Sequence, residues 1–117
     1  MDIKQSDKLK LWLFCGFELN RLQYTDGDYQ YHEDVHLWIA LPICLDTLYK
    51  YAIPKLQKEG ILIELSPVRY KGFTAKTISA NGYSSLALEI YDSPTEALYN
   101  AIMKVIDNEV KHEISEK

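Results

Sequence analysis

Long hydrophobic runs are missing from this chain of 117 residues. No apolar run approaches the roughly 18 residues that a membrane span needs, and the longest candidate, 9–17, is interrupted by Lys10. The N-terminal segment carries Asp2 and Asp7, and it lacks the basic and then apolar pattern of a secretory signal. The sequence therefore predicts a cytoplasmic protein without a membrane partner.

Cysteine and excess positive charge are also scarce. The only two cysteines, Cys15 and Cys44, match neither a disulfide framework nor a metal-binding spacing, and their apolar neighbours predict buried free thiols. The chain has 17 acidic and 13 basic residues, a formal net charge of −4. Because the nucleic-acid backbone attracts clustered positive charge, this balance argues against general nucleic-acid binding.

The composition that is present belongs to one globular domain. The chain is 47% hydrophobic and 26% charged, which is typical of a soluble globular protein. Its length is enough to form one hydrophobic core without disulfide bonds or structural metal ions. We therefore expect residues 1–117 to form a single domain, in which 111–117 is a charged tail that frays.

Helical spacing of apolar residues predicts three helices, at approximately 7–15, 46–59 and 94–110. Ser6 is the expected N-cap of the first helix. The last helix has the clearest start, because Ser93 and Glu96 form a capping box with proline between them at the first helical position. Pro54 predicts a kink within the second helix, since it lacks a backbone donor.

β-forming residues predict three antiparallel strands, at approximately 61–66, 72–80 and 83–91. Asn81-Gly82 is the expected hairpin turn between the last two strands. The expected fold class is α+β, with this three-stranded sheet packed by the helices in an α-β-α sandwich-like arrangement. The segment before the second helix is less regular: 25–28 is a strong turn, and 29–40 is predicted to be strand or loop.

The stretch His32-Glu33-Asp34-Val35-His36 matches the H-E-x-x-H zinc peptidase motif. On a helix, His32 and His36 would bind zinc and Glu33 would act as general base, with a third ligand from elsewhere. On a strand the two histidines would lie about 13 Å apart, too far to share one ion. We favour a solvated or partner-facing acidic segment over the zinc site.

Two further groups of residues are candidate binding sites. Basic and aromatic residues in and next to the predicted strands suggest an anion or nucleotide site made by Arg69, Tyr70, Lys71, Lys76 and Tyr83. The alternative is that these residues are strand sides that guard a sheet edge against aggregation.

Tyrosines beside acidic residues suggest a surface for a protein partner, namely Tyr24, Tyr29 and Tyr31. Packing in the core explains such tyrosines equally well. Trp12 and Trp38 are both expected in the core.

Several stretches together resemble the phage α-β-α (ABA) sandwich domain family. They cover the end of the first helix at 13–17, the start and middle of the second helix at 41–48 and 54–56, and above all the capped helix start at 93–102. The resemblance spans most of the chain and rests on structural motifs. It implies an accessory phage protein, and the family has no established catalytic residues to carry over. The segment 18–40 departs from the family pattern, since it is longer and more aromatic.

These observations favour a non-catalytic binding module, without a cofactor, in the cytoplasm of an infected bacterial host. It would antagonise host defence by binding a host protein or by sequestering a small anionic, nucleotide-like ligand. A ligand-sequestering protein would be expected to form a homo-oligomer. The alternative is a minimal zinc-dependent hydrolase that uses His32, Glu33 and His36, with zinc as its cofactor.

Overall fold

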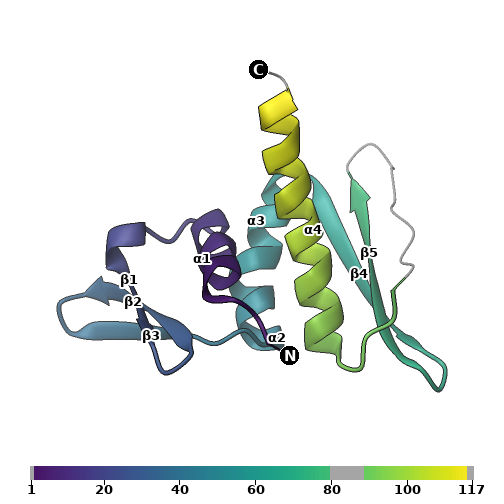
Figure 1. Ribbon diagram of the computed structural model, residues 1–117, viewed down its shortest axis with the longest axis horizontal. Coiled ribbons are helices and arrows are strands. Elements are labelled where there is room, and N and C mark those ends of the chain that lie inside the picture. The colour runs from purple at the N-terminus through teal and green to yellow at the C-terminus, as the bar shows by residue number, and fades with distance from the viewer. Residues whose placement is uncertain (1, 80–88, 116–117) are drawn as a thin grey trace.

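The computed structural model describes residues 2–79 and 89–115, with side chains through 78 and from 89 to 107. Helices and strands within these residues are shown in Figure 1 and follow the chain in this order: α1 (Gln5–Phe14), η1 (Leu19–Arg21), β1 (Leu22–Thr25), β2 (Asp28–Asp34), β3 (Leu37–Leu41), α2 (Leu45–Thr47), η2 (Leu48–Ala52), α3 (Ile53–Lys58), β4 (Ile61–Val68), β5 (Gly72–Ser79) and α4 (Pro94–Ser115).

The segment before the second predicted helix forms a three-stranded antiparallel sheet, which we call sheet A. Its strand order is β1-β2-β3, so β2 is central and β1 and β3 are edge strands. A two-residue turn joins β1 to β2, and both of its residues, Asp26 and Gly27, have positive φ. That conformation suits the right-handed twist of the flanking strands. The predicted turn at 25–28 and the preference for strand over helix at 29–40 are thus confirmed.

The predicted strands 61–66 and 72–80 correspond to β4 and β5, an antiparallel pair that we call sheet B. Val68 and Gly72 end the pairing, and a tight turn with Tyr70 at φ 62° joins the strands. The predicted third strand, 83–91, and the Asn81-Gly82 turn lie largely outside the described residues. At the described end, Tyr91 forms an antiparallel bridge with Phe73.

Three short helical segments together make the predicted helix 46–59. The wide π-type turn η2 lies directly before Pro54, whose missing N–H cannot bond to the carbonyl one α-helical turn earlier. The expected irregularity at this proline is therefore present. The helix begins at a capping box made by Cys44 and Thr47 and ends before Gly60, which has φ 77°.

The helix α4 lies at the centre of the molecule. It contacts both strands of sheet B, and it also contacts α1, α2 and η2. The core forms around these contacts, and its largest fully buried side chains are Leu11, Trp12, Leu41, Leu48, Leu56, Leu98 and Ile102. Burying each such side chain stabilises the fold by about 2 kcal/mol.

The α+β class is confirmed. Sheet A packs on α1 and sheet B packs on α4, so the helices lie between the two sheets (Figure 1). This layer order is β-α-β, where the family resemblance implies α-β-α. It leaves sheet A at one end of a flat molecule whose extents are 44 × 41 × 22 Å. The far side of sheet A, away from α1, is consequently where strand side chains meet solvent.

Candidate functional site

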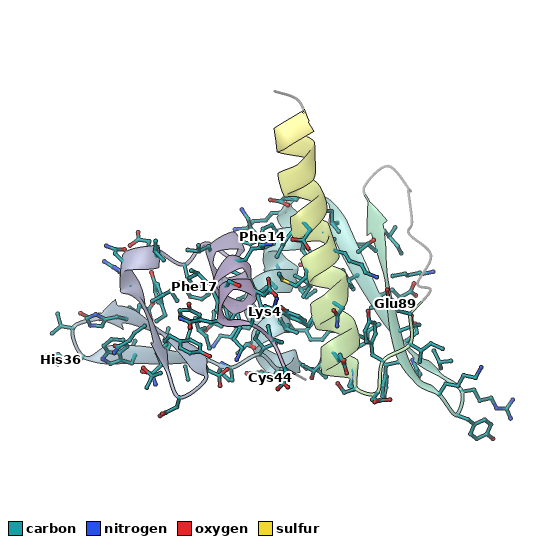
Figure 2. All side chains as sticks on the ribbon, viewed as in Figure 1. Lys4, Phe14, Phe17, His36, Cys44 and Glu89 are labelled. Atoms are coloured by element: carbon teal, nitrogen blue, oxygen red, sulfur yellow. The ribbon has the colours of Figure 1, made fainter. Side chains whose placement is uncertain are left out.

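The H-E-x-x-H stretch lies in the hairpin between β2 and β3. His32 belongs to β2, and a bulge follows it because the pairing shifts between His32 and Asp34. The carboxylate of Asp34 accepts a hydrogen bond from the backbone N–H of the next residue, Val35, at 2.6 Å. His36 follows in the turn, and Figure 2 shows it at the outer end of sheet A, far from α1, α3 and α4. This placement gives the motif strand geometry.

The two histidines have different surroundings. The ring of His32 stacks on Trp38 with centroids 4.5 Å apart and planes at 11°, while His36 is exposed. His32 Nε2 is buried without a hydrogen-bond partner in the described part of the chain. Across residues 2–79 and 89–107, no three histidine, cysteine, aspartate or glutamate side chains converge as a metal site. The donors present therefore do not fit the zinc ion of a peptidase.

The three tyrosines proposed for partner binding lie on the face of sheet A that packs toward α1. Tyr29 is buried, and its hydroxyl accepts a hydrogen bond from Gln5 at 3.3 Å. Tyr31 is half-buried against Phe17, with ring centroids 4.6 Å apart. Tyr24 pairs edge-to-face with Tyr29 and is the most exposed of the three. Tyr29 and Tyr31 thus anchor sheet A to the helices, and only Tyr24 is well placed to meet a partner.

The opposite face of sheet A presents a tryptophan to solvent. Trp38 is 47% exposed, which corrects the expectation that it belongs to the core, whereas Trp12 is fully buried as expected. Val35 and Leu37, beside it at the turn, are 73% and 50% exposed. Sequence patterns missed this group because the uncharged run Leu37–Leu41 is typical of a buried strand. Only the strand order places it at an edge.

Acidic side chains surround this apolar group. Glu33 and Asp34 are exposed beside the β2–β3 turn, and no lysine or arginine occurs between Arg21 and Lys50. Lys8 reaches over from α1 to pair with Asp28 at 3.5 Å, and Arg21 pairs with Glu18 at 3.2 Å. Arg21 also donates a hydrogen bond to the backbone carbonyl of Glu33 at 3.4 Å, but within the described residues no ion pair involves the carboxylates of Glu33 or Asp34. The outer end of sheet A therefore combines exposed apolar side chains with negative charge.

The candidate anion site divides into two parts. Arg69, Tyr70 and Lys71 come together at the β4–β5 turn, where Tyr70 is 93% exposed and the Arg69 guanidinium lies 5.3 Å from its ring centre. Lys76 instead pairs with Glu64 across sheet B at 3.1 Å. Four strand residues lie between Lys71 and Lys76, which places them about 17 Å apart along the strand. Tyr83 lies outside the described residues.

Both cysteines are free thiols and half-buried. Burial raises the pKa of the Cys15 thiol to about 12, and the nearby Lys55 only partly opposes this effect. Since the thiolate is the nucleophile, Cys15 is chemically inert at neutral pH.

None of the described helices combines the length and apolar character required to cross a membrane. No family model, curated protein or solved structure matches the chain.

Proposed function

We propose that the chain is a non-catalytic module that binds a protein segment along β3 and the β2–β3 turn. The observation that carries this proposal is the edge strand β3 itself. Its sequence, Leu-Trp-Ile-Ala-Leu, contains no charge and no proline. Natural edge strands are usually blunted by lysine, proline or bulges, because unpaired backbone groups otherwise recruit another strand. An extended segment of a partner can add to such an edge and place alternate side chains on Trp38.

The charge around β3 specifies the chemistry of the partner. Glu33 and Asp34 lie exposed beside the apolar side chains, and the segment between Arg21 and Lys50 has no basic residue. A complementary segment therefore alternates apolar residues with lysine or arginine, since like charges would be repelled. In the phage-type accessory role that the family resemblance implies, this segment belongs to a host protein met in the host cytoplasm. The module requires no metal for this role.

A display library of extended peptides tests the proposal directly. We expect selection on the immobilised protein to enrich peptides that alternate apolar and basic residues. Trp38→Lys should weaken their binding at least tenfold, because it places a charge where the partner's apolar side chains pack. Leu62→Lys is the matched control, since Leu62 is also an apolar strand residue, 53% exposed, but lies on sheet B.

Three outcomes would contradict this proposal. One is the enrichment of acidic peptides, and another is an equal loss of binding with Leu62→Lys. The third is a homodimer in light scattering that Trp38→Lys dissociates, because the occupant of β3 would then be a second copy of the chain.

We propose anion binding at the β4–β5 turn as a second function, favoured by the exposed Arg69–Tyr70 stack. A nucleotide could stack on Tyr70 while Arg69 and Lys71 contact its phosphates. A nucleotide that binds the folded state must raise the melting temperature, and we expect Arg69→Glu to abolish that shift. Lys50→Glu is the matched control, because Lys50 also lies over a tyrosine ring, that of Tyr51. The absence of a shift with any nucleoside triphosphate would contradict this second function.

A further inference from the structure

A pocket of about 280 Å³ lies where the N-terminal segment meets the first turns of α4. Figure 1 shows the N-terminus beside the lower end of α4, well away from the β2–β3 turn. The residues lining this pocket are Asp2, Ile3, Asp7, Glu96, Tyr99 and Asn100.

The lining is strongly acidic. Asp2, Asp7 and Glu96 all contribute to it, and within residues 2–79 and 89–107 none of these three carboxylates forms an ion pair. The positive end of the α4 dipole offsets part of the charge on Glu96. Asp7 lies in the first turn of α1, whose dipole offsets part of its charge in the same way, whereas Asp2 precedes that helix. Like charges gathered in one concave site repel one another, and a bound cation would relieve that repulsion.

Tyr99 is a second and independent sign of a ligand. The residue is only 6% exposed, it lines the pocket, and its hydroxyl has no hydrogen-bond partner among the described residues. Burial, followed by the charges of Asp7 and Asp107, raises its pKa to about 12, so the hydroxyl stays protonated. The hydroxyl oxygen is not one of the buried unpartnered atoms of the described residues, which are Trp12 Nε1 and His32 Nε2, so it stays accessible to a ligand. An unpaired hydroxyl in the wall of an acidic pocket can accept a hydrogen bond from a cationic N–H donor.

Asn100 adds a second acceptor. Its amide nitrogen donates to the carbonyl oxygen of Glu96 at 2.8 Å, which fixes the side chain by one end. Asn100 also lines the pocket, and its amide oxygen accepts no hydrogen bond within the described residues. Among the described residues, the pocket wall thus combines three carboxylates with two neutral oxygen acceptors and one aliphatic side chain, that of Ile3.

The spacing of these groups favours an organic cation over a metal ion. A metal requires three or more donors that converge within about 2.6 Å of one point, and the described residues include no such group. An ammonium group donates hydrogen bonds along three directions, with longer nitrogen-to-oxygen distances of about 2.9 Å. We propose that this pocket binds a primary ammonium group, carried either by a free polyamine or by a lysine side chain of another protein.

Titration of the isotope-labelled protein, followed by amide chemical shifts at constant ionic strength, tests the proposal. Spermidine represents the free polyamine, and acetyl-lysine methylamide represents the protein side chain. We expect saturable shifts near residues 2–7 and 96–100 with at least one of the two. Glu96→Gln should weaken that binding about fivefold. Asp46→Asn should leave it unchanged, because Asp46 is also a first-turn helix carboxylate but lies outside the pocket.

Tyr99→Phe removes the hydroxyl but keeps the buried ring, so it tests the role of the hydroxyl in binding without disturbing the core. We expect weaker ammonium binding with the melting temperature preserved. Tighter binding of spermidine would identify the free amine as the ligand, and tighter binding of the lysine derivative would identify a protein side chain. The proposal is overturned if neither amine saturates, if Mg²⁺ binds this pocket more tightly, or if Asp46→Asn weakens amine binding as much as Glu96→Gln does. None of these results depends on the partner of β3.

Discussion

At the scale of single residues, the two tryptophans show how position outweighs residue type. Trp12 is fully buried and meets Phe17 and Tyr51 edge-to-face, with ring centroids 6.0 and 6.4 Å away. Trp38 stacks on His32 alone among the aromatic rings of the described residues, and it is 47% exposed to water. The first tryptophan therefore contributes to stability, and the second is available for recognition.

We predict that acrylamide quenches Trp38 and spares Trp12. Trp38→Phe should remove most of the quenchable fluorescence and change the free energy of unfolding by less than about 0.5 kcal/mol, as expected for an exposed site. Trp12→Phe, the control, should destabilise the protein by about 2 kcal/mol, because it leaves a cavity in the core. Equal quenching of the two single-tryptophan variants would show that the solvent exposure described for them is incorrect.

Gly72 occupies a position that no other residue can fill easily. Its φ is 128°, and a Cβ added there would lie 2.2 Å from the backbone oxygen of Tyr91. We predict that Gly72→Ala destabilises the protein by about 3 kcal/mol through this backbone clash. Gly16→Ala is the control, because Gly16 also has positive φ but nothing lies within 4 Å of its added Cβ. Its cost should be about 1 kcal/mol, measured by urea unfolding.

At the scale of secondary structure elements, local signals were reliable where they involve the backbone directly. The hydroxyl of Ser93 accepts a hydrogen bond from the backbone N–H of Glu96 at 3.1 Å, so the predicted cap of α4 exists. Ser6, the predicted cap of α1, lies inside that helix, which begins at Gln5 after Lys4 and has no side-chain cap. Serine therefore caps the helix at the start of α4 but does not cap α1.

We predict that Ser93→Ala lowers the free energy of unfolding by about 1 kcal/mol, the usual cost of losing an N-cap. Ser6→Ala should be neutral or slightly stabilising, because alanine has the higher helix propensity. Thermal and urea unfolding of the two variants would measure this difference. A larger loss in Ser6→Ala than in Ser93→Ala would mean that α1 begins where the sequence pattern predicts it.

At the scale of the whole molecule, burial couples stability to pH. Burial is the leading cause that raises the pKa of Cys15 from 9.0 to about 12, and those of Tyr91 and Tyr99 from 10.0 to about 12. Above pH 9 the unfolded chain releases protons that the folded chain retains. The unfolded state is then favoured increasingly as pH rises from 9 toward 12.

We predict that the urea midpoint is constant near pH 8 and falls progressively above pH 9. In Cys15→Ala the decline should begin about one pH unit later, because the tyrosines of the unfolded chain titrate only near pH 10. A midpoint that stays constant up to pH 10.5 in the native sequence would contradict the prediction.

The fold was more predictable than the sites, for physical reasons. Three local features depend only on residues close together in the chain: the helical spacing of apolar residues, the Asp26-Gly27 turn and the Ser93 cap. They can therefore be read from the sequence. The surface around Trp38 depends on which strand ends a sheet, and an apolar strand has the same composition at an edge or in the centre. The pocket around Tyr99 depends on the meeting of two segments about 90 residues apart, which no local pattern records.

The sequence by itself determined the α+β class, the helix near the C-terminus, the strands on either side of the β4–β5 turn and the strand character of the H-E-x-x-H stretch. Each follows from residue spacing, capping or turn chemistry over a few positions. Only the tertiary structure decided that the helices lie between the sheets, that Tyr29 is buried while Trp38 is exposed, and that Asp2, Asp7 and Glu96 share one pocket. These outcomes depend on how elements distant in the chain pack, and burial and charge at each residue follow from that packing.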